Sequence, residues 1–188
     1  MATSKIYVSA NRLTRDSFRL ARMVYDSGWK PDLLIGIWRG GTPIAVAVHE
    51  FLRVKGLKLH HIAMKCSSYA GMSRLDSPVN FEYCEEILDS IAPDTRVLLV
   101  DDVFDSGRTM KACSMRLRAI PADVRIATVF WKPDENLTDI QPDFYVNALN
   151  NWIVFPHELE GLSDEEIRIK DPVVSALLRG DPEPCFYS

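Results

Sequence analysis

The residues best suited to chemistry lie in one short stretch, Val97–Met110, which combines carboxylates, hydroxyls, a glycine and an arginine. An apolar run leads directly into Asp101 and Asp102, and a Ser-Gly-Arg-Thr turn over 106–109 follows. Free N–H groups at a helix start, with hydroxyl and guanidinium donors beside them, favour an anion such as phosphate. Two adjacent carboxylates suit sugar hydroxyls or a hydrated Mg²⁺ better than the same phosphate. The stretch therefore indicates a ribose 5-phosphate.

The spacing of this stretch also allows a comparison with two other kinds of loop. It could be an acidic strand-to-helix turn with a serine cap, because short motifs occur by chance in many α/β proteins. A P-loop does not fit, since Walker A needs a glycine five residues before its Gly-Lys pair. In this chain Asp102 occupies that position relative to Gly107.

A second loop, Trp38–Thr42, repeats the order of apolar strand, glycine turn and helix start. Thr42 is expected to cap the helix and Pro43 to be its first residue. Two anion-binding loops at neighbouring strand ends would suit a ligand with phosphates at both ends. The alternative is a plain connection between a strand and a helix.

Strands and helices are predicted to alternate, which indicates an α/β fold with a parallel sheet flanked by helices. Apolar runs predict strands over 32–38, 57–65, 96–100, 124–131 and 144–148. Apolar spacing predicts helices over 13–27, 43–55 and 107–119, and a capping box at Ser163 opens a short C-terminal helix. Ligands of such sheets bind outside the carboxyl ends of the strands, where both charged loops lie.

Composition narrows the class of protein. A chain of 188 residues is expected to form one domain over 1–188. A net charge of −4 argues against a broad nucleic-acid surface. No apolar run approaches the ~20 residues that cross a bilayer, and the first residues lack a signal-peptide core. The scattered cysteines fit reduced thiols, so a cytoplasmic protein with no membrane partner is expected.

The whole stretch Val97–Met110 resembles the signature of the type I phosphoribosyltransferases, which binds 5-phosphoribosyl-1-diphosphate (PRPP). The resemblance extends over roughly 32–158. It implies Mg²⁺ as the cofactor, met by the carboxylates, and a contact of Arg39 and Gly40 with pyrophosphate, often through a cis peptide at that step. The PRPP-binding residues that it implies in the signature are Asp101, Asp102, Asp105, Ser106, Gly107, Arg108 and Thr109.

The residue before the Ser-Gly pair separates the acceptor bases within that family. It is Asp105 here, as in the hypoxanthine–guanine and xanthine–guanine enzymes. In the adenine and uracil enzymes, and in a pyrimidine-operon regulator of this fold, it is typically another residue. The resemblance implies that Asp105 lies near N7 of the base and takes its proton as the catalytic base. The alternative is a loop aspartate that caps the following helix.

Lys132 is the second discriminator, because an ammonium group only donates hydrogen bonds and so selects a carbonyl over an amino group. It follows an apolar strand and resembles the lysine that binds the 6-oxo group of the purine. This favours a 6-oxopurine over adenine. The alternative is a solvated lysine at a strand end.

A third part of the base site is implied by the run Trp152–Glu158, similar to a Trp-Ile…Pro-aromatic-acid run in microbial xanthine–guanine and archaeal guanine enzymes. The resemblance implies that Trp152 stacks on the purine, the backbone of Ile153 contacts the base edge, and Glu158 reaches Mg²⁺. These residues and Lys132 would form a base-binding segment of about 131–160. The chain departs from the pattern at His157-Glu158, where an aromatic–Asp pair is usual, and Trp152 could instead be a core residue.

The polar segment 66–80 is predicted to be a long loop, and such loops often cover active sites. Its Ser68-Tyr69 pair resembles the mobile hood of the family, which closes over the diphosphate and excludes water. Ser68 and Tyr69 thus join the PRPP contacts that the resemblance implies. The alternative is an ordinary serine-rich surface loop.

Together these residues predict a Mg²⁺-dependent 6-oxopurine phosphoribosyltransferase of purine salvage. Hypoxanthine, guanine or xanthine would displace pyrophosphate from C1 of the sugar and yield a nucleoside 5′-monophosphate. Two alternatives stay open: a phosphoribosyltransferase for another base, and a non-catalytic nucleotide-binding regulator of the same fold. The resemblance also implies a homodimer or homotetramer.

Overall fold

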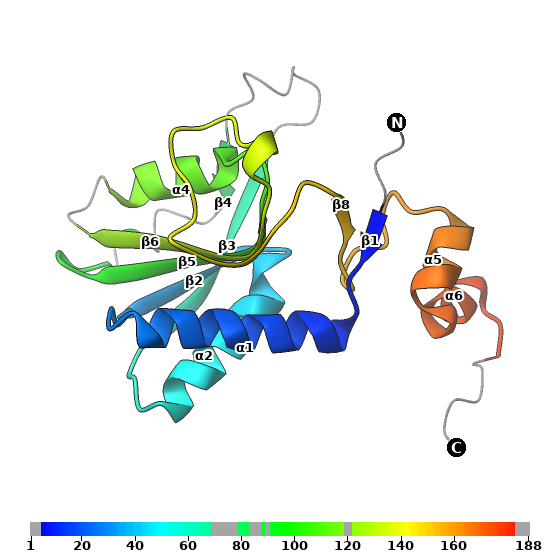
Figure 1. Cartoon of the computed structure of the whole chain (residues 1–188), viewed down its shortest axis with the longest axis horizontal. Helices are drawn as coiled ribbons and strands as arrows, with labels where there is room; N and C mark the ends of the chain where they lie inside the picture. The colour runs from blue at the N-terminus through cyan, green and yellow to red at the C-terminus, as the bar shows by residue number, and fades with distance from the viewer. Residues whose placement is uncertain (1–4, 69–78, 83–87, 89–90, 119–121, 183–188) are drawn as a thin grey trace. The chain divides into compact units, whose positions relative to one another are not determined.

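The structure is a computed structural model that describes residues 5–68, 79–82, 88, 91–118 and 122–182 (Figure 1). The chain divides into two compact units, Leu13–Asn150 and a smaller unit of Met1–Arg12 with Asn151–Ser188. The expected single domain over 1–188 stays a prediction. Across the described residues no helix has the length and apolar character that a bilayer crossing needs.

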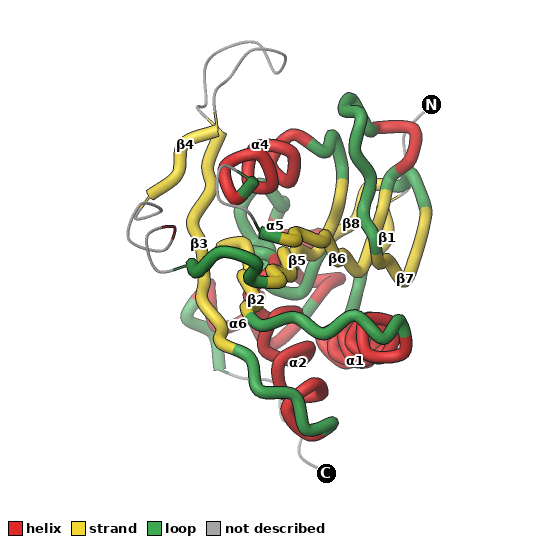
Figure 2. Tube along the Cα trace, turned by 90° about the vertical axis from the view of Figure 1, so that its left-hand side faces the viewer, coloured by secondary structure: helices red, strands yellow, loops and turns green. Residues whose placement is uncertain are grey.

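The larger unit contains, among its described residues, a six-stranded sheet in the order β4-β3-β2-β5-β6-β7. Neighbouring strands are parallel except β4, which runs antiparallel to β3 at one edge (Figure 2). The predicted parallel sheet is confirmed, with this one antiparallel edge. The strands are β2 (Leu33–Trp38), β3 (His60–Ser68), β4 (Val79–Glu82), β5 (Arg96–Phe104), β6 (Asp123–Trp131) and β7 (Phe144–Ala148).

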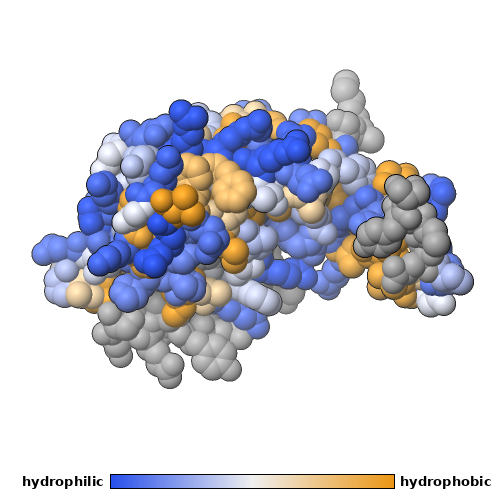
Figure 3. Space-filling model, turned by 90° about the horizontal axis from the view of Figure 1, so that it is seen from below, coloured by the Kyte–Doolittle hydropathy of each residue, from blue (hydrophilic) through white to orange (hydrophobic). Residues whose placement is uncertain are grey.

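Helices cover both faces of this sheet (Figure 1). α1 (Ala10–Asp26) and α2 (Gly41–Val54) lie on one face, and α4 (Arg108–Leu117) lies on the other. The apolar run of β5 is fully buried between these layers, as expected for a central parallel strand. The helix face seen in Figure 3 is mainly hydrophilic with separate apolar side chains, which are common on protein surfaces.

β5 is longer than its apolar run predicts. The predicted strand ends at Val100, but the observed strand continues to Phe104, so Asp101 and Asp102 lie inside it. The reason is pairing with β6, which continues from Asp101↔Thr128 to Phe104↔Trp131. Backbone hydrogen bonds hold a strand whether or not its side chains are polar.

Other element boundaries also differ from the prediction. Residues 66–68 of the predicted loop 66–80 belong to β3 and 79–80 belong to β4, while 69–78 lie outside the described residues. The predicted cap of α2 is wrong, because the N-cap is Gly40. Thr42 lies inside the helix, and its hydroxyl donates to the Arg39 carbonyl at 2.7 Å. Pro43 is therefore the third residue of the helix and not the first, and the first turn tolerates its missing N–H.

The smaller unit contains a short parallel pair, β1 (Lys5–Tyr7) and β8 (Trp152–Val154), which was not predicted because each strand has only three residues. Two helices follow, α5 (Asp164–Lys170) and α6 (Pro172–Arg179). The predicted capping box is confirmed, since the Ser163 side chain accepts from the Glu166 N–H and the Glu166 side chain from that of Ser163.

Candidate functional site

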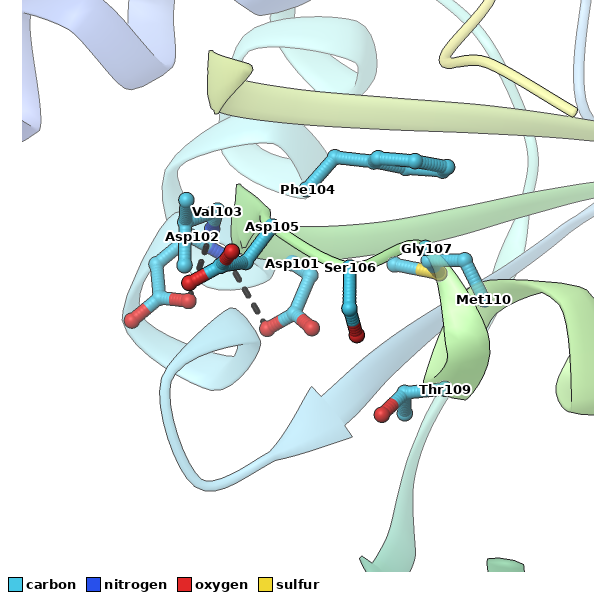
Figure 4. A pocket seen from close by; sticks show the side chains of 9 residues that line it. All are labelled: Asp101, Asp102, Val103, Phe104, Asp105, Ser106, Gly107, Thr109 and Met110. Carbon is cyan, nitrogen blue, oxygen red and sulfur yellow. Dashed lines mark hydrogen bonds between the residues drawn. The ribbon is translucent and has the colours of Figure 1, made fainter. Parts of the chain in front are cut away.

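The candidate site is a pocket of about 220 Å³ at the carboxyl end of β5. One continuous stretch of chain lines it, Asp101–Gly107 with Thr109 and Met110. Figure 4 shows the Asp101 carboxylate and the Ser106 and Thr109 hydroxyls on the same open side, while Phe104 points away. The Asp101 carboxylate and the two hydroxyls of the predicted signature are thus brought together, and Asp102 also lines the pocket.

Gly107 determines how the loop turns into α4. It is the N-cap of α4, with φ of 76°, in the left-handed region that glycine adopts most easily. A Cβ at this position would lie 2.5 Å from Thr138 Oγ1 and 2.8 Å from Asn136 Oδ1. Because the cap residue has no side chain, it does not satisfy the first N–H groups of the helix, which favour an anion. Neither Asp105 nor Ser106 is the helix cap, so the purely structural cap interpretations are wrong.

Asp101 and Asp102 occupy consecutive strand positions and so point to opposite faces of the sheet. Asp101 Oδ1 accepts from the Asp102 N–H at 3.0 Å, and Asp102 Oδ1 accepts from the Val103 N–H at 2.7 Å. Burial, followed by the charge of Asp102, raises the pKa of Asp101 well above its ordinary value. A cation or hydroxyl donors beside this carboxyl would stabilise its charged form and so lower its pKa again.

The carboxylates fit Mg²⁺ as a partner, because hard oxygen ligands are what this ion prefers. Within the described residues no group of three or more His, Cys, Asp or Glu side chains converges on one point. Waters and substrate phosphate oxygens commonly serve as further ligands of this ion.

The second predicted anion loop lies against the first. A Cβ on Gly40 would come within 2.1 Å of Asp102 Oδ2, and a Cβ on Gly41 within 2.3 Å of the Val100 carbonyl oxygen. Only glycines allow this approach, so the Arg39–Gly40 loop and the β5 carboxylates form one site. The cis peptide is at Trp38–Arg39, one bond earlier than the Arg39–Gly40 step that the resemblance implied.

Asp105 and Lys132, predicted from separate segments to contact the purine, form an ion pair with Nζ 3.0 Å from Oδ2. Lys132 is buried, with 9% of its surface exposed, whereas half of the Asp105 side chain is exposed. The Lys132 N–H also donates to the Phe104 carbonyl at 2.9 Å, which fixes β6 and the loop together. The alternative of a solvated strand-end lysine is wrong.

Sequence reasoning missed residues 136–139, a segment that packs against the loop 105–107. The Leu137 N–H donates to the Ser106 carbonyl at 3.1 Å. Asn136 Oδ1 accepts from both the N–H and the hydroxyl of Thr138, at 2.9 and 2.8 Å. The Asn-x-Thr spacing is typical of an Asx turn and was the available signal.

The remaining predicted site residues belong to other elements of the chain. Trp152 is exposed at the start of β8, which argues against a core role, and Ile153 is buried. Glu158 Oε2 accepts from the Phe155 N–H at 3.2 Å. All three belong to the smaller unit, and their roles stay predictions. Ser68 is the last residue of β3, and Tyr69 lies outside the described residues.

The family match and the named sequence relatives are all phosphoribosyltransferases. Residues 5–164 match the family described as "Phosphoribosyl transferase domain". The chain is 28% identical over 179 residues to the hypoxanthine-guanine phosphoribosyltransferase of Lactococcus lactis subsp. lactis, covering 94% of this chain and 92% of that one. The match to the same enzyme of Streptococcus pneumoniae strain R6 is 27% over 158 residues, with 83% and 84% covered.

Two solved structures are similar in fold. The purine phosphoribosyltransferase from Pyrococcus horikoshii Ot3 gives a TM-score of 0.66 at 28% identity, covering 85% of this chain and 97% of that chain. A hypothetical protein from Neisseria gonorrhoeae with bound ppGpp gives 0.74 at 23% identity, with 92% and 98% covered. At 23% identity, the similarity to the Neisseria gonorrhoeae protein shows a common fold and nothing about function.

Proposed function

Because the chain belongs to the phosphoribosyl transferase domain family, we propose that it transfers the 5-phosphoribosyl group of PRPP to a 6-oxopurine. Hypoxanthine, guanine or xanthine would displace pyrophosphate from C1 and give a nucleoside 5′-monophosphate, a reaction of purine salvage. The names of the relatives, hypoxanthine-guanine and purine phosphoribosyltransferases, support this substrate class.

The observation that carries the choice of base is the Asp105–Lys132 pair at the rim of the pocket. An ammonium group has three N–H donors, so Lys132 can keep its bond to Asp105 and donate another to a 6-oxo oxygen. The exposed half of Asp105 leaves a carboxylate oxygen able to accept a proton from N7. A 6-amino group offers donors to Lys132 and would leave the N–H that points to the base without an acceptor there, so adenine is disfavoured.

The sugar diphosphate would occupy the two joined loops. Residues Ser106–Thr109 would bind the 5-phosphate through backbone and hydroxyl donors, and Asp101 and Asp102 would accept from the ribose hydroxyls. Arg39 and Gly40 would bind the pyrophosphate. Mg²⁺, when held by these carboxylates and the substrate, supplies positive charge that stabilises the leaving pyrophosphate.

The base would lie against Asp105 and Lys132. As the bond from N9 to C1 forms, the purine becomes more acidic at N7, and Asp105 would take that proton as the catalytic base. Trp152 would stack on the ring, Ile153 would present its backbone to the base edge, and Glu158 would approach the metal through water. Ser68 and Tyr69 would close over the diphosphate and exclude water, which otherwise intercepts the sugar cation.

We also propose a cytoplasmic homodimer or homotetramer that binds neither nucleic acid nor membrane. Nucleic acid is not proposed as a partner because the net charge of the chain is −4, which would repel a phosphate backbone. Sedimentation velocity of the purified chain measures the oligomeric state directly. A monomer at micromolar concentration would contradict this part of the proposal.

A screen of acceptor bases tests the function. Purified protein with PRPP and Mg²⁺ is offered hypoxanthine, guanine, xanthine, adenine, uracil and orotate in turn, and released pyrophosphate is measured. We expect turnover of at least one 6-oxopurine and none of adenine. Turnover of adenine alone would contradict the base assignment, and PRPP binding without pyrophosphate release would favour the non-catalytic regulator.

A further inference from the structure

Two thiols meet beneath the pocket, on the α4 face of the sheet. Cys66 Sγ on β3 and Cys113 Sγ on α4 are 3.3 Å apart, and both are free thiols. Cys113 is fully buried, whereas Cys66 is partly exposed. A reactive thiol that solvent can reach, beside a second thiol that can resolve it, is the arrangement of an oxidisable pair.

The pair is connected to the phosphate-binding pocket by packing. Cys113 belongs to the same buried cluster as Met110, and Cys66 packs against that cluster. Met110 also lines the pocket. Cys113 follows the first residue of α4, Arg108, by little more than one turn. A change at the sulfur atoms therefore reaches the helix start that faces the ligand.

We propose that Cys66 and Cys113 form a reversible disulfide that weakens PRPP binding in the pocket at the start of α4. Formation of the bond does not depend on the proposed function, whereas its effect on PRPP binding rests on that function. The oxidant is a peroxide, and the reductant that reverses the bond is a dithiol.

The chemistry balances in two steps. The Cys66 thiol loses its proton and the sulfur attacks one oxygen of hydrogen peroxide. The O–O bond breaks, Cys66 becomes a sulfenic acid, and the departing hydroxide takes up the proton that Cys66 lost and leaves as water. The sulfur of Cys113 then attacks the Cys66 sulfur, the S–O bond breaks, and the departing hydroxide takes the Cys113 proton to form a second water. Two thiols have lost two electrons to one peroxide, and one S–S bond has formed.

The bond must draw the two sulfur atoms together, because a disulfide is about 2.05 Å long and their present separation is 3.3 Å. β3 is hydrogen-bonded on both sides, to β2 and to β4, so it resists displacement. Cys113 is enclosed in a packed core, where its side chain has little room to rotate. The shift therefore falls on α4 and on the loop that leads into it.

The experiment uses the full chain with Cys84→Ser and Cys185→Ser, so that Cys66 and Cys113 are its remaining cysteines. After treatment with hydrogen peroxide, peptide mass spectrometry measures the link and free-thiol titration measures its extent. We expect a Cys66–Cys113 link and a KM for PRPP raised about tenfold, since a misplacement of about 1 Å can cost up to about 100-fold. A dithiol reductant should restore the original KM.

Matched variants complete the test. Cys113→Ser and, if it folds poorly by circular dichroism, Cys113→Ala should show no link and no change of KM on the same treatment. Absence of the link in the parent, or a link with unchanged KM, would overturn the proposal. If the reduced protein lacks transferase activity, the proposed function fails instead. In that case peptide mass spectrometry still detects the disulfide, and calorimetric titration measures whether the disulfide changes the Kd for PRPP.

Discussion

Single residues determine the conformation of the loop at the end of β5, which we propose to bind phosphate. Gly107 allows the left-handed turn and the close approach of Asn136 and Thr138, and Gly40 allows the second loop to reach Asp102. Both glycines lie in segments that the sequence singled out. The spacing of Asn136 and Thr138 indicates their turn, but their contact with the loop could not be predicted, because it joins segments about thirty residues apart that only the fold brings together.

Replacement of Asp105 tests the proton transfer. In Asp105→Asn the amide cannot accept the N7 proton at neutral pH, so kcat should fall by about 10²–10⁴, the usual contribution of general acid–base catalysis. Steady-state kinetics with hypoxanthine or guanine measures this. Asp181→Asn, an exposed acid in the smaller unit, is the control and should keep the parent kcat. An unchanged kcat in Asp105→Asn would remove this residue from the mechanism.

Replacement of Gly107 tests the close packing of the loop, and Gly28 offers a matched control. Both have positive φ, 76° and 78°, so alanine at either should cost about 1–2 kcal/mol of unfolding free energy. An alanine at Gly28 meets nothing within 4 Å, whereas at Gly107 it collides with Thr138, Asn136 and Phe104. Urea unfolding and PRPP kinetics separate the two effects. Only Gly107→Ala should raise the KM for PRPP, and an equal KM in both variants would show that the packing is unimportant.

Most helices and strands could be predicted from the sequence, because their apolar residues recur at regular spacing. The alternation of strands and helices, β7 over 144–148 and the capping box at Ser163 were all predicted from apolar spacing and cap chemistry. The carboxyl end of β5 was not predicted, because the strand continues through two charged residues that its pairing with β6 holds in place. Pairing partners lie far apart in sequence, so hydrophobic runs alone underestimate such strands.

An ion pair at the opposite end of the sheet from the carboxylate pair joins two of these elements. Asp32, just before β2, accepts from the Arg96 side chain at 2.7 and 2.8 Å and from its N–H at 3.1 Å. These hydrogen bonds lower the pKa of Asp32. A lowered folded-state pKa stabilises the fold above the unfolded pKa of about 3.9, and the contribution is lost as pH falls through the folded value.

Asp32→Asn should therefore flatten the decline of unfolding free energy below about pH 4. Because the pair is largely solvent-exposed, the loss at pH 7 should be at most about 1 kcal/mol. Urea titrations at a series of pH values measure both quantities. In a double-mutant cycle, adding Arg96→Met to Asp32→Asn should remove no further pH dependence. A decline as steep as that of the parent would show that the pair has no role in acid stability.

At the scale of the whole molecule, the site depends on two loops that a central parallel sheet brings side by side. The order β2-β5-β6 places the Arg39–Gly40 loop, the β5 carboxylates and Lys132 at the carboxyl ends of adjacent strands. The rule for ligand position in parallel sheets predicted this edge from the sequence. The family match over residues 5–164 includes the part of the smaller unit that carries Trp152 and Glu158. The role of these two residues in base binding is predicted by resemblance alone.

Ligand binding across these joined loops should stabilise the folded molecule, and the stabilisation should need the metal. At PRPP about 100 times its Kd, the folded state gains about 2.7 kcal/mol. For a chain of this size this corresponds to a Tm higher by about 5–10 °C. Differential scanning calorimetry should show that rise with Mg²⁺ present and a much smaller one with a chelator, because burial and the charge of Asp102 disfavour the Asp101 carboxylate, and a divalent cation beside it would offset that charge. Asp101→Asn should reduce the difference between the Tm shift measured with Mg²⁺ and the Tm shift measured with chelator. Equal shifts with Mg²⁺ and with chelator would mean that PRPP binds without the carboxylate-bound metal.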